Sequence, residues 1–251
     1  MQRFRSFDGF EIAYMTAGLG PDVLLLHGFA ADHGANWVQP GIVDALVDAG
    51  RHVIAYDARG HGQSAKPHDP DAYAGDAMVG DARALLDHLA VEEVDVVGYS
   101  MGAMTSARLV TREPRARSLV LGGVGGRLAR GRMPVARGAI ADALLADDPR
   151  TIENVGARAF RRFAERTGAD RQALAALQHS PRAEVRTALG EIGVPTLVLV
   201  GDGDTLAGDP GELAAAIPGA RSHVVSGDHL NAVYDPAFRE AIVDFLALVS
   251  S

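Results

Sequence analysis

The chain has 251 residues, of which 47% are hydrophobic, 22% charged and 6% aromatic, a composition that provides a sizeable aliphatic core and excludes a disordered chain. It contains no cysteine, which excludes disulfides, thiolate metal sites and a cysteine nucleophile. The net charge of −8 argues against a nucleic-acid partner, because neutralising phosphates takes a positively charged face. No apolar run approaches the roughly 20 residues that span a bilayer, and no hydrophobic signal region follows Met1, so we expect a cytoplasmic protein without a membrane partner.

Short apolar runs alternate with segments of helical periodicity along most of the chain. Residues 1–20 alternate in hydrophobicity around Asp8-Gly9, which predicts an antiparallel hairpin at the edge of a sheet. The segments between the later runs repeat apolar residues at helical spacing, so the sequence predicts an α/β fold with a mostly parallel, eight-stranded sheet. The six runs that predict buried parallel strands are Val23–Leu26, Val53–Tyr56, Val94–Val97, Ser118–Leu121, Thr196–Val200 and Ser222–Val225.

The alternation stops between residues 124 and 193, where the pattern is helical and predicts no strand. Such a connection is far longer than an ordinary loop, so we expect a helical insertion with its own small core. The charge changes in the same place. Residues 124–190 contain 12 arginines and seven acidic residues, a net charge of +5, whereas the rest of the chain carries −13.

The motif Gly98-Tyr99-Ser100-Met101-Gly102 follows the predicted strand Val94–Val97 and precedes a helical stretch. A G-x-S-x-G pattern at a strand-to-helix junction is typical of a nucleophile elbow. The serine of such a turn has strained backbone geometry, and the flanking glycines let the helix approach the strand without side-chain collision. Ser100 is therefore the candidate nucleophile. The alternative is a serine that only caps the helix, with glycines that serve packing.

A serine nucleophile needs a base and an acid that orients the base. His229 stands just beyond the last predicted strand, where it returns to the sheet edge that carries Ser100. The acid should follow an earlier strand, as Gly201-Asp202-Gly203-Asp204 does. Asp204 is our candidate, because the tight turn lets a residue three places past the strand fold back toward the histidine. Asp202 is the second choice, and Asp228, adjacent to His229, the third.

The order Ser100, Asp204, His229 is that of α/β-hydrolases, and the chain resembles this family over nearly its whole length. The resemblance implies helices on both faces of the sheet, a core domain of residues 1–123 and 194–251, and a small helical cap of residues 124–193 inserted after the sixth strand. It also implies an oxyanion hole formed by the backbone N–H groups of Phe29 and Met101, and no metal or other cofactor. The further motifs that carry the resemblance are His27-Gly28-Phe29, the turn from Asp57 to Ser64, and the ending from His229 through Asp235-Pro236.

Other conspicuous residues have simpler interpretations. We interpret the turn from Asp57 to Ser64 as scaffold and Trp37 as a packing residue. In the cap, Arg127 or Arg130 is a candidate to meet a substrate carboxylate, with arginines that only face water as the alternative. The cap residues expected to face a pocket are Phe160, Phe163, Leu174 and Leu177.

The resemblance implies a serine hydrolase that cleaves a small carboxylic ester, lactone or thioester through an acyl-enzyme intermediate. Enol-lactonase, carbon–carbon bond hydrolase, cofactor-free perhydrolase and menaquinone-pathway lyase activities on the same fold are alternatives, as is a non-catalytic ligand-binding protein. Ser100 argues against the aspartate chemistry of haloalkane dehalogenases and epoxide hydrolases. Lys66, the only lysine, lies in a surface-like loop, which argues against a hydroxynitrile lyase. The sequence leaves the oligomeric state open.

Overall fold

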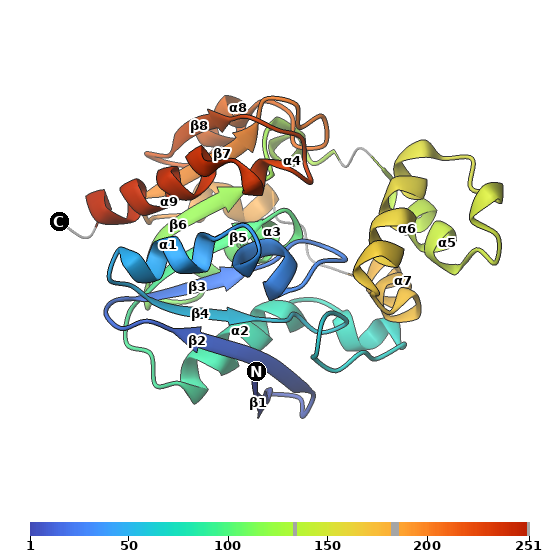
Figure 1. The fold of residues 1–251 in the computed structure, drawn as a ribbon, viewed down its shortest axis with the longest axis horizontal. Helices are drawn as coiled ribbons and strands as arrows, with labels where there is room; N and C mark the ends of the chain where they lie inside the picture. The colour runs from blue at the N-terminus through green and yellow to red at the C-terminus, as the bar shows by residue number, and fades with distance from the viewer. Residues whose placement is uncertain (133–134, 182–185, 250–251) are drawn as a thin grey trace.

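An eight-stranded sheet forms the centre of the molecule (Figure 1). The computed structural model describes residues 1–132, 135–181 and 186–249. The strands lie in the order β1-β2-β4-β3-β5-β6-β7-β8, and each of the six predicted parallel strands lies within two residues of its expected bounds, so the prediction is confirmed. The strands are β1 (Gln2–Arg5), β2 (Glu11–Ala17), β3 (Asp22–Leu26), β4 (His52–Tyr56), β5 (Val94–Tyr99), β6 (Ala116–Gly122), β7 (Thr196–Gly201) and β8 (Arg221–Val225).

The first two strands form the predicted antiparallel hairpin at one edge of the sheet. Phe4 pairs with Ile12, and Gly9 takes a positive φ of 89° in the turn between the strands. β2 continues antiparallel against β4, and every later pairing is parallel. Parallel strands end at a common edge, so the segments after β3, β5, β7 and β8 meet at the carboxyl edge of the sheet.

Side chains of the central strands alternate between two buried layers, as the strand period of two requires. On β3, Leu24 and Leu26 belong to the layer that also contains residues of α2, α3 and α8, while Val23 and Leu25 belong to the layer that contains residues of α1 and α9. Trp37 is fully buried in this second layer, which supports its interpretation as a packing residue. The helices of the two layers are α1 (Ile42–Asp48), α2 (Ala77–His88), α3 (Met101–Val110), α8 (Pro210–Ala215) and α9 (Pro236–Val249), with short turns η1 (Gly34–Val38), η2 (Pro70–Tyr73) and η5 (Ala232–Tyr234) between them.

Only helices and turns occupy the described part of the segment between β6 and β7. Figure 1 places α5, α6 and α7 together beside the end of the sheet toward which β3 and β6 point. They enclose a third apolar cluster that includes Ile140, Leu144, Ala164 and Leu174 and that reaches Ala30 of the core. Residues 133–134 and 182–185 of the expected cap lie outside the described residues. The elements of this segment are α4 (Gly126–Ala129), α5 (Arg137–Leu145), η3 (Pro149–Thr151), α6 (Val155–Thr167), α7 (Arg171–His179) and η4 (Arg186–Glu191).

Capping residues define the ends of α6, and a buried arginine holds it in place. The side chain of Asn154 accepts a hydrogen bond from the Ala157 N–H at the helix start, and Gly168 ends the helix in the left-handed conformation. The Arg161 guanidinium donates to the carbonyls of Ala143 and Ala146, at 2.8 Å each, where α5 ends. It thereby satisfies carbonyl groups that have no partner within α5 and holds α6 against that helix.

Candidate active site

The turn from β5 into α3 has the geometry of a nucleophile elbow. Ser100 lies at φ 52°, ψ −108°, a strained conformation for a residue with a side chain, and its N–H donates to the Gly122 carbonyl at 2.8 Å. A Cβ at Gly98 would lie 2.5 Å from the Gly102 carbonyl oxygen, and one at Gly102 would lie 2.0 Å from that of Leu26. Only glycine fits at these two positions, because the approaching atoms belong to the backbone.

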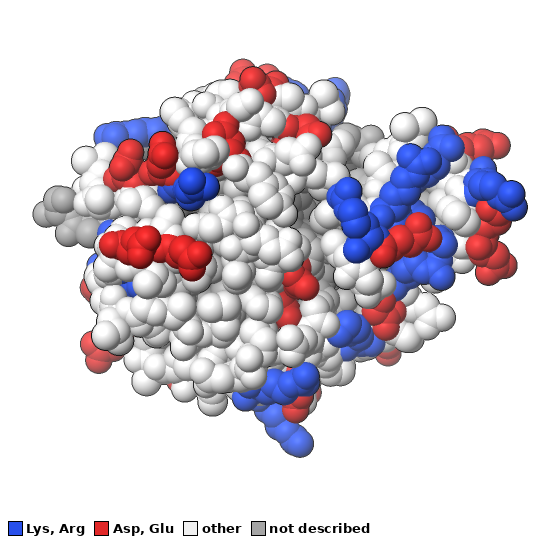
Figure 2. Space-filling model, in the orientation of Figure 1, with Lys and Arg blue, Asp and Glu red and all other residues white. Residues whose placement is uncertain are grey.

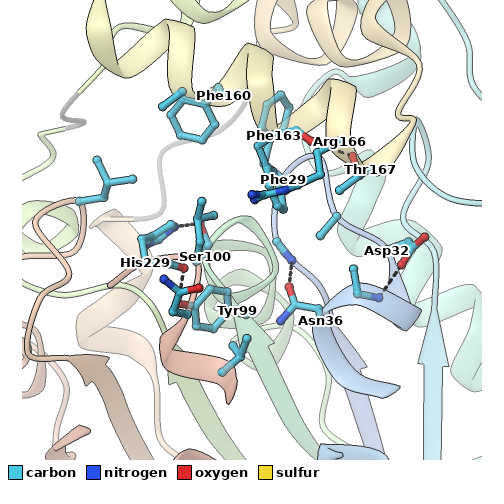
Figure 3. A pocket seen from close by; sticks show the side chains of 18 of the residues that line it. Phe29, Asp32, Asn36, Tyr99, Ser100, Phe160, Phe163, Arg166, Thr167 and His229 are labelled. Carbon is cyan, nitrogen blue, oxygen red and sulfur yellow. Dashed lines mark hydrogen bonds between the residues drawn. The ribbon is translucent and has the colours of Figure 1, made fainter. Parts of the chain in front are cut away.

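The structure brings Ser100, His229 and Asp204 together in one hydrogen-bonded series (Figure 3). The His229 Nε2 atom lies 3.0 Å from Ser100 Oγ, and its Nδ1 atom lies 2.7 Å from Asp204 Oδ2. The Asp204 side chain is fully buried, whereas 14% of the His229 side chain is exposed. Asp204 Oδ1 accepts hydrogen bonds from the N–H groups of Leu206 and Ala207, both at 2.9 Å. These two donors fix the carboxylate so that its other oxygen faces the imidazole.

Asp202 and Asp228, the other two candidates for the orienting acid, bond to backbone N–H groups of the loop that carries His229. Asp202 Oδ1 accepts a hydrogen bond from the Gly227 N–H at 3.0 Å. Asp228 Oδ1 accepts from the N–H groups of Leu230 and Asn231. The structure therefore places Asp204, and not Asp202 or Asp228, against the His229 ring.

The predicted oxyanion donors lie on both sides of Ser100. Met101 is the first residue of α3, where helix N–H groups have no partner within the helix. Gly28, before Phe29, approaches Ser100 so closely that a Cβ on it would lie 3.6 Å from the serine Cβ. Asn36 Oδ1 accepts the Gly28 N–H at 2.8 Å and fixes this segment. Within the described residues, neither the Phe29 nor the Met101 N–H donates to a protein acceptor.

The polar turn after β4 bonds to the scaffold beneath these groups. Asp57 accepts hydrogen bonds from the His33 ring and from the N–H groups of His33 and Gln63. Burial opposes ionisation of Asp57, but these donors outweigh burial and hold its pKa below the ordinary range. Burial lowers the pKa of His27, which accepts the Ala58 N–H, and lowers the pKa of His61 to about 3. These contacts support the interpretation of the turn as scaffold.

A cavity of about 650 Å³ opens above Ser100 and His229. Figure 3 shows Phe160, Phe163, Arg166 and Thr167 of α6 over it, and the two phenylalanines were expected there. The expectation that Leu174 and Leu177 also face the pocket is wrong. Both are fully buried in apolar clusters, because α7 packs between α5 and the core instead of lining the cavity.

The two arginines proposed to meet a substrate carboxylate lie elsewhere, which corrects that expectation. Arg127 Nε donates to the Thr205 carbonyl at 3.0 Å, and Arg130 pairs with Glu212 of α8. Neither lines the cavity. The reason is that α4, which carries Arg127, packs against α8 at the side of the sheet instead of over Ser100.

Sequence reasoning missed several residues that line the cavity or support it. Tyr99 occupies a variable position of the elbow motif, so the motif assigns it no role, yet its hydroxyl donates to the His229 carbonyl at 2.7 Å. Thr167 Oγ1 donates to the carbonyl of Ala30 at 2.8 Å and so joins α6 to the segment after Phe29. Asn36 and Arg166 lie in none of the sequence motifs described above. Only the packing of distant segments brings these residues to the site.

Neither a metal centre nor a membrane span is found in the part of the chain that the structure describes. No three His, Asp or Glu side chains there are grouped so as to hold a metal ion. None of the described helices has the length and apolar character to cross a bilayer.

Comparisons with known proteins agree with this architecture. The sequence profile of the alpha/beta hydrolase fold matches residues 21–180. The chain is 29% identical over 212 residues to 3-oxoadipate enol-lactonase 2 of Acinetobacter baylyi, covering 76% of each protein. It is 40% identical over 116 residues to a non-heme chloroperoxidase of Kitasatospora aureofaciens, a match that covers 45% of this chain and 40% of that protein. The chain spans less than half the length of the first curated relatives that it matches.

Solved structures are similar over almost the whole chain. The enol-lactonase from Burkholderia xenovorans is 28% identical, with a TM-score of 0.75 over 98% of this chain and 100% of that one. A hydrolase from Pseudomonas aeruginosa is also 28% identical, with a TM-score of 0.77 over 98% and 97% of the two chains. The profile match covers more than half of the sequence, and the sheet has the strand count and mostly parallel pairing that the sequence pattern predicts. The chain therefore belongs to the α/β-hydrolase fold family.

Proposed function

We propose that this chain is a serine hydrolase that cleaves a small carboxylic ester, lactone or thioester through an acyl-enzyme intermediate. The observation that carries the proposal is the series Ser100 Oγ, His229 Nε2, His229 Nδ1, Asp204 Oδ2, with separations of 3.0 Å and 2.7 Å at its two ends. Nucleophile and base lie within hydrogen-bond reach, and a third group orients the base, which is the arrangement that covalent catalysis by serine needs.

In the first half of the reaction, Ser100 Oγ attacks the carbonyl carbon while His229 Nε2 takes the hydroxyl proton. The charge that develops on the carbonyl oxygen is stabilised by the N–H groups of Phe29 and Met101. Each such donor contributes on the order of 100- to 1,000-fold in rate, because the charge exists only in the transition state. The carbon–oxygen bond to the leaving group then breaks, and His229 delivers its proton to the departing alcohol.

In the second half, His229 removes a proton from water, whose oxygen attacks the acyl-enzyme. Collapse of the second tetrahedral intermediate releases the acid and returns the proton to Ser100. Asp204 keeps the imidazole in one tautomer and stabilises its charged form in both halves. The buried position of Asp204 and its two N–H donors suit this role, since they hold one carboxylate oxygen on Nδ1 throughout.

The helical segment 124–193 is proposed to act as a cap on a core formed by residues 1–123 and 194–251. Support comes from α6, whose Phe160 ring meets Phe29 edge-on with 5.9 Å between centroids. Phe160 and Phe163 present apolar rings to the cavity, so the cap helps to select the acyl or alcohol group by shape and to exclude water. Among small substrates, a lactone is supported by the enol-lactonase relative that covers 76% of each protein.

A second candidate is perhydrolysis, in which hydrogen peroxide replaces water in the attack on the acyl-enzyme and releases a peracid. The specific support is the similarity to the non-heme chloroperoxidase. Peracid formation depends on the same Ser100 ester, so it accompanies hydrolysis instead of replacing the mechanism. Comparing acid and peracid released from one ester, with and without peroxide, measures the share of each reaction.

Labelling with a fluorophosphonate probe tests the proposal directly. The wild-type protein is expected to be labelled at Ser100, and Ser100→Ala is expected to abolish labelling while circular dichroism stays unchanged. Ser106→Ala is a matched control on α3, since Ser106 is fully buried and outside the cavity lining. A well-folded wild-type protein that takes no label and hydrolyses no p-nitrophenyl ester would overturn the proposal in favour of a non-catalytic ligand-binding protein.

A further inference from the structure

One basic side chain reaches the cavity without an acidic partner. Arg166, near the end of α6, lines the cavity together with Phe163 and Thr167, and Figure 3 shows it extending over the site from that helix. Its guanidinium carbon lies 5.2 Å from the centroid of the Phe163 ring, a cation–π distance that helps to fix its direction. Among the described residues, no carboxylate lies within 4.0 Å of it.

Most of the other arginines that the structure describes in the segment 124–193 have partners outside the cavity. Arg161 supports the end of α5, and Arg130 pairs with Glu212. On α6 itself, Arg158 and Arg162 precede Arg166 at intervals of four residues and so form one row along the helix. Figure 2 shows basic side chains gathered on the helices beside the core. Of this row only Arg166 belongs to the cavity lining.

No acidic side chain of the described cavity lining forms an ion pair with the Arg166 guanidinium. Among the described lining residues Asp32 is the only carboxylate, and its Oδ1 atom accepts the Ala35 N–H at 2.7 Å. The groups next to Arg166 on α6 are the Phe163 ring and Thr167, whose hydroxyl donates to Ala30. An arginine with a free planar fork beside apolar surface is a binding group for a carboxylate.

We propose that Arg166 binds a carboxylate of the substrate, so that the site prefers esters or lactones that carry a free carboxylate beyond the bond that is cleaved. This inference rests on the proposed hydrolase function and names its substrate class. The carboxylate takes the place of the missing acidic partner, while Phe160 and Phe163 contact the carbon chain between it and the scissile carbonyl.

Matched ester pairs test the proposal. Monomethyl adipate and methyl hexanoate differ only at the end far from the ester, where the first has a carboxylate and the second a methyl group. Two shorter pairs are monomethyl glutarate with methyl pentanoate, and monomethyl succinate with methyl butanoate. Hydrolysis is followed by pH-stat titration. For at least one chain length, Arg166→Ala is expected to lower kcat/KM for the anionic ester by about 10- to 100-fold, the value of one lost charge-assisted contact. The neutral partner is expected to change by no more than about twofold.

Two variants sharpen this result. Arg166→Lys keeps the charge but not the fork, so it is expected to recover only part of the preference. Arg162→Ala removes an exposed arginine from the same helix outside the cavity, and it is expected to leave the ratio of the two kcat/KM values unchanged. Equal losses on both esters in Arg166→Ala, or a wild-type protein that prefers the neutral ester at every chain length, would overturn the proposal.

Binding to an inactive variant separates this proposal from the hydrolase proposal. Ser100→Ala is titrated calorimetrically with adipate and with glutarate, and the double variant Ser100→Ala/Arg166→Ala is titrated in the same way. Binding that weakens at least tenfold in the double variant supports carboxylate recognition by Arg166 even if no ester is hydrolysed. Equal binding by the two variants, or binding by neither, contradicts it even if the probe labels Ser100.

Discussion

The hydroxyl of Tyr99 donates a hydrogen bond to the backbone carbonyl of His229, with 2.7 Å between the oxygens. Tyr99 immediately precedes Ser100, and its ring centroid lies 5.6 Å from that of the imidazole. The bond therefore ties the end of β5, which carries the nucleophile, to the loop that carries the base. We expect it to help hold His229 at its distance from Ser100 without taking part in proton transfer.

Tyr99→Phe keeps the ring and removes this bond. Because one hydrogen bond contributes about 1 kcal/mol, we expect kcat for p-nitrophenyl acetate to fall by about threefold to tenfold. The rate of fluorophosphonate labelling should fall by a similar factor, since both depend on the position of His229. An unchanged kcat would show that the loop is held without Tyr99.

Ser100→Ala and His229→Ala should each lower kcat by several powers of ten. The double variant is expected to lose little more than either single variant, because nucleophile and base act as one unit. Measuring kcat on one ester for the wild type, the two single variants and the double variant gives a double-mutant cycle. Losses that add on a logarithmic scale would mean that the two residues work independently.

Asp204→Asn and Asp202→Asn form a matched pair. Asparagine at 204 loses the carboxylate that fixes the imidazole tautomer, so kcat is expected to fall by on the order of 1,000-fold or more. Asparagine at 202 keeps an oxygen that accepts the Gly227 N–H, so kcat should change by no more than about threefold. The opposite ranking would move the orienting acid to Asp202.

Gly102→Ala tests the close approach of α3 to β3. The new methyl group would lie 2.0 Å from the Leu26 carbonyl oxygen and 2.7 Å from that of His27, and neither backbone atom can yield without moving a strand. We expect a loss of about 3 kcal/mol in the free energy of unfolding, measured by urea denaturation. Gly138→Ala is the control, since no atom lies within 4 Å of its added Cβ. That exposed change on α5 should be neutral or stabilise by up to about 1 kcal/mol.

The buried ring of His61 makes stability depend on pH. Burial lowers its pKa from 6.5 to about 3, so between these values the unfolded chain binds a proton that the folded chain does not. Stability is therefore present above pH 6.5 and is lost as the pH falls. His27, whose pKa is also lowered by burial, contributes in the same direction.

His61→Asn removes the titrating group while keeping a donor for the Arg59 carbonyl, which the His61 Nδ1 atom contacts at 3.0 Å. The loss of unfolding free energy between pH 7.5 and pH 5 should be about 2 kcal/mol smaller in the variant than in the wild type. Urea denaturation at both pH values gives this difference, and comparing slopes cancels the packing change. Equal pH dependence in the two proteins would mean that His61 is protonated in the folded state.

Local patterns in the sequence were enough for the strands and for the elbow. A buried strand needs a short apolar run and a sharp turn needs glycine, and both signals lie within a few neighbouring residues. The candidate series Ser100, Asp204, His229 followed from chain order and from the rule that parallel strands share a carboxyl edge. Its hydrogen-bonded geometry agrees with that order, since Asp202 and Asp228 turn to backbone N–H groups instead of the imidazole.

Only the tertiary structure decided which residues of the helical segment reach the cavity. The sequence determined that this segment is helical and basic, but helical periodicity does not say against which surface each helix packs. Arg127 and Arg130 lie beside α8, Leu174 and Leu177 are buried, and Arg166 lines the cavity. These positions depend on contacts between segments far apart in the chain, such as Thr167 with Ala30, and the direction of a side chain at a site is fixed by such contacts.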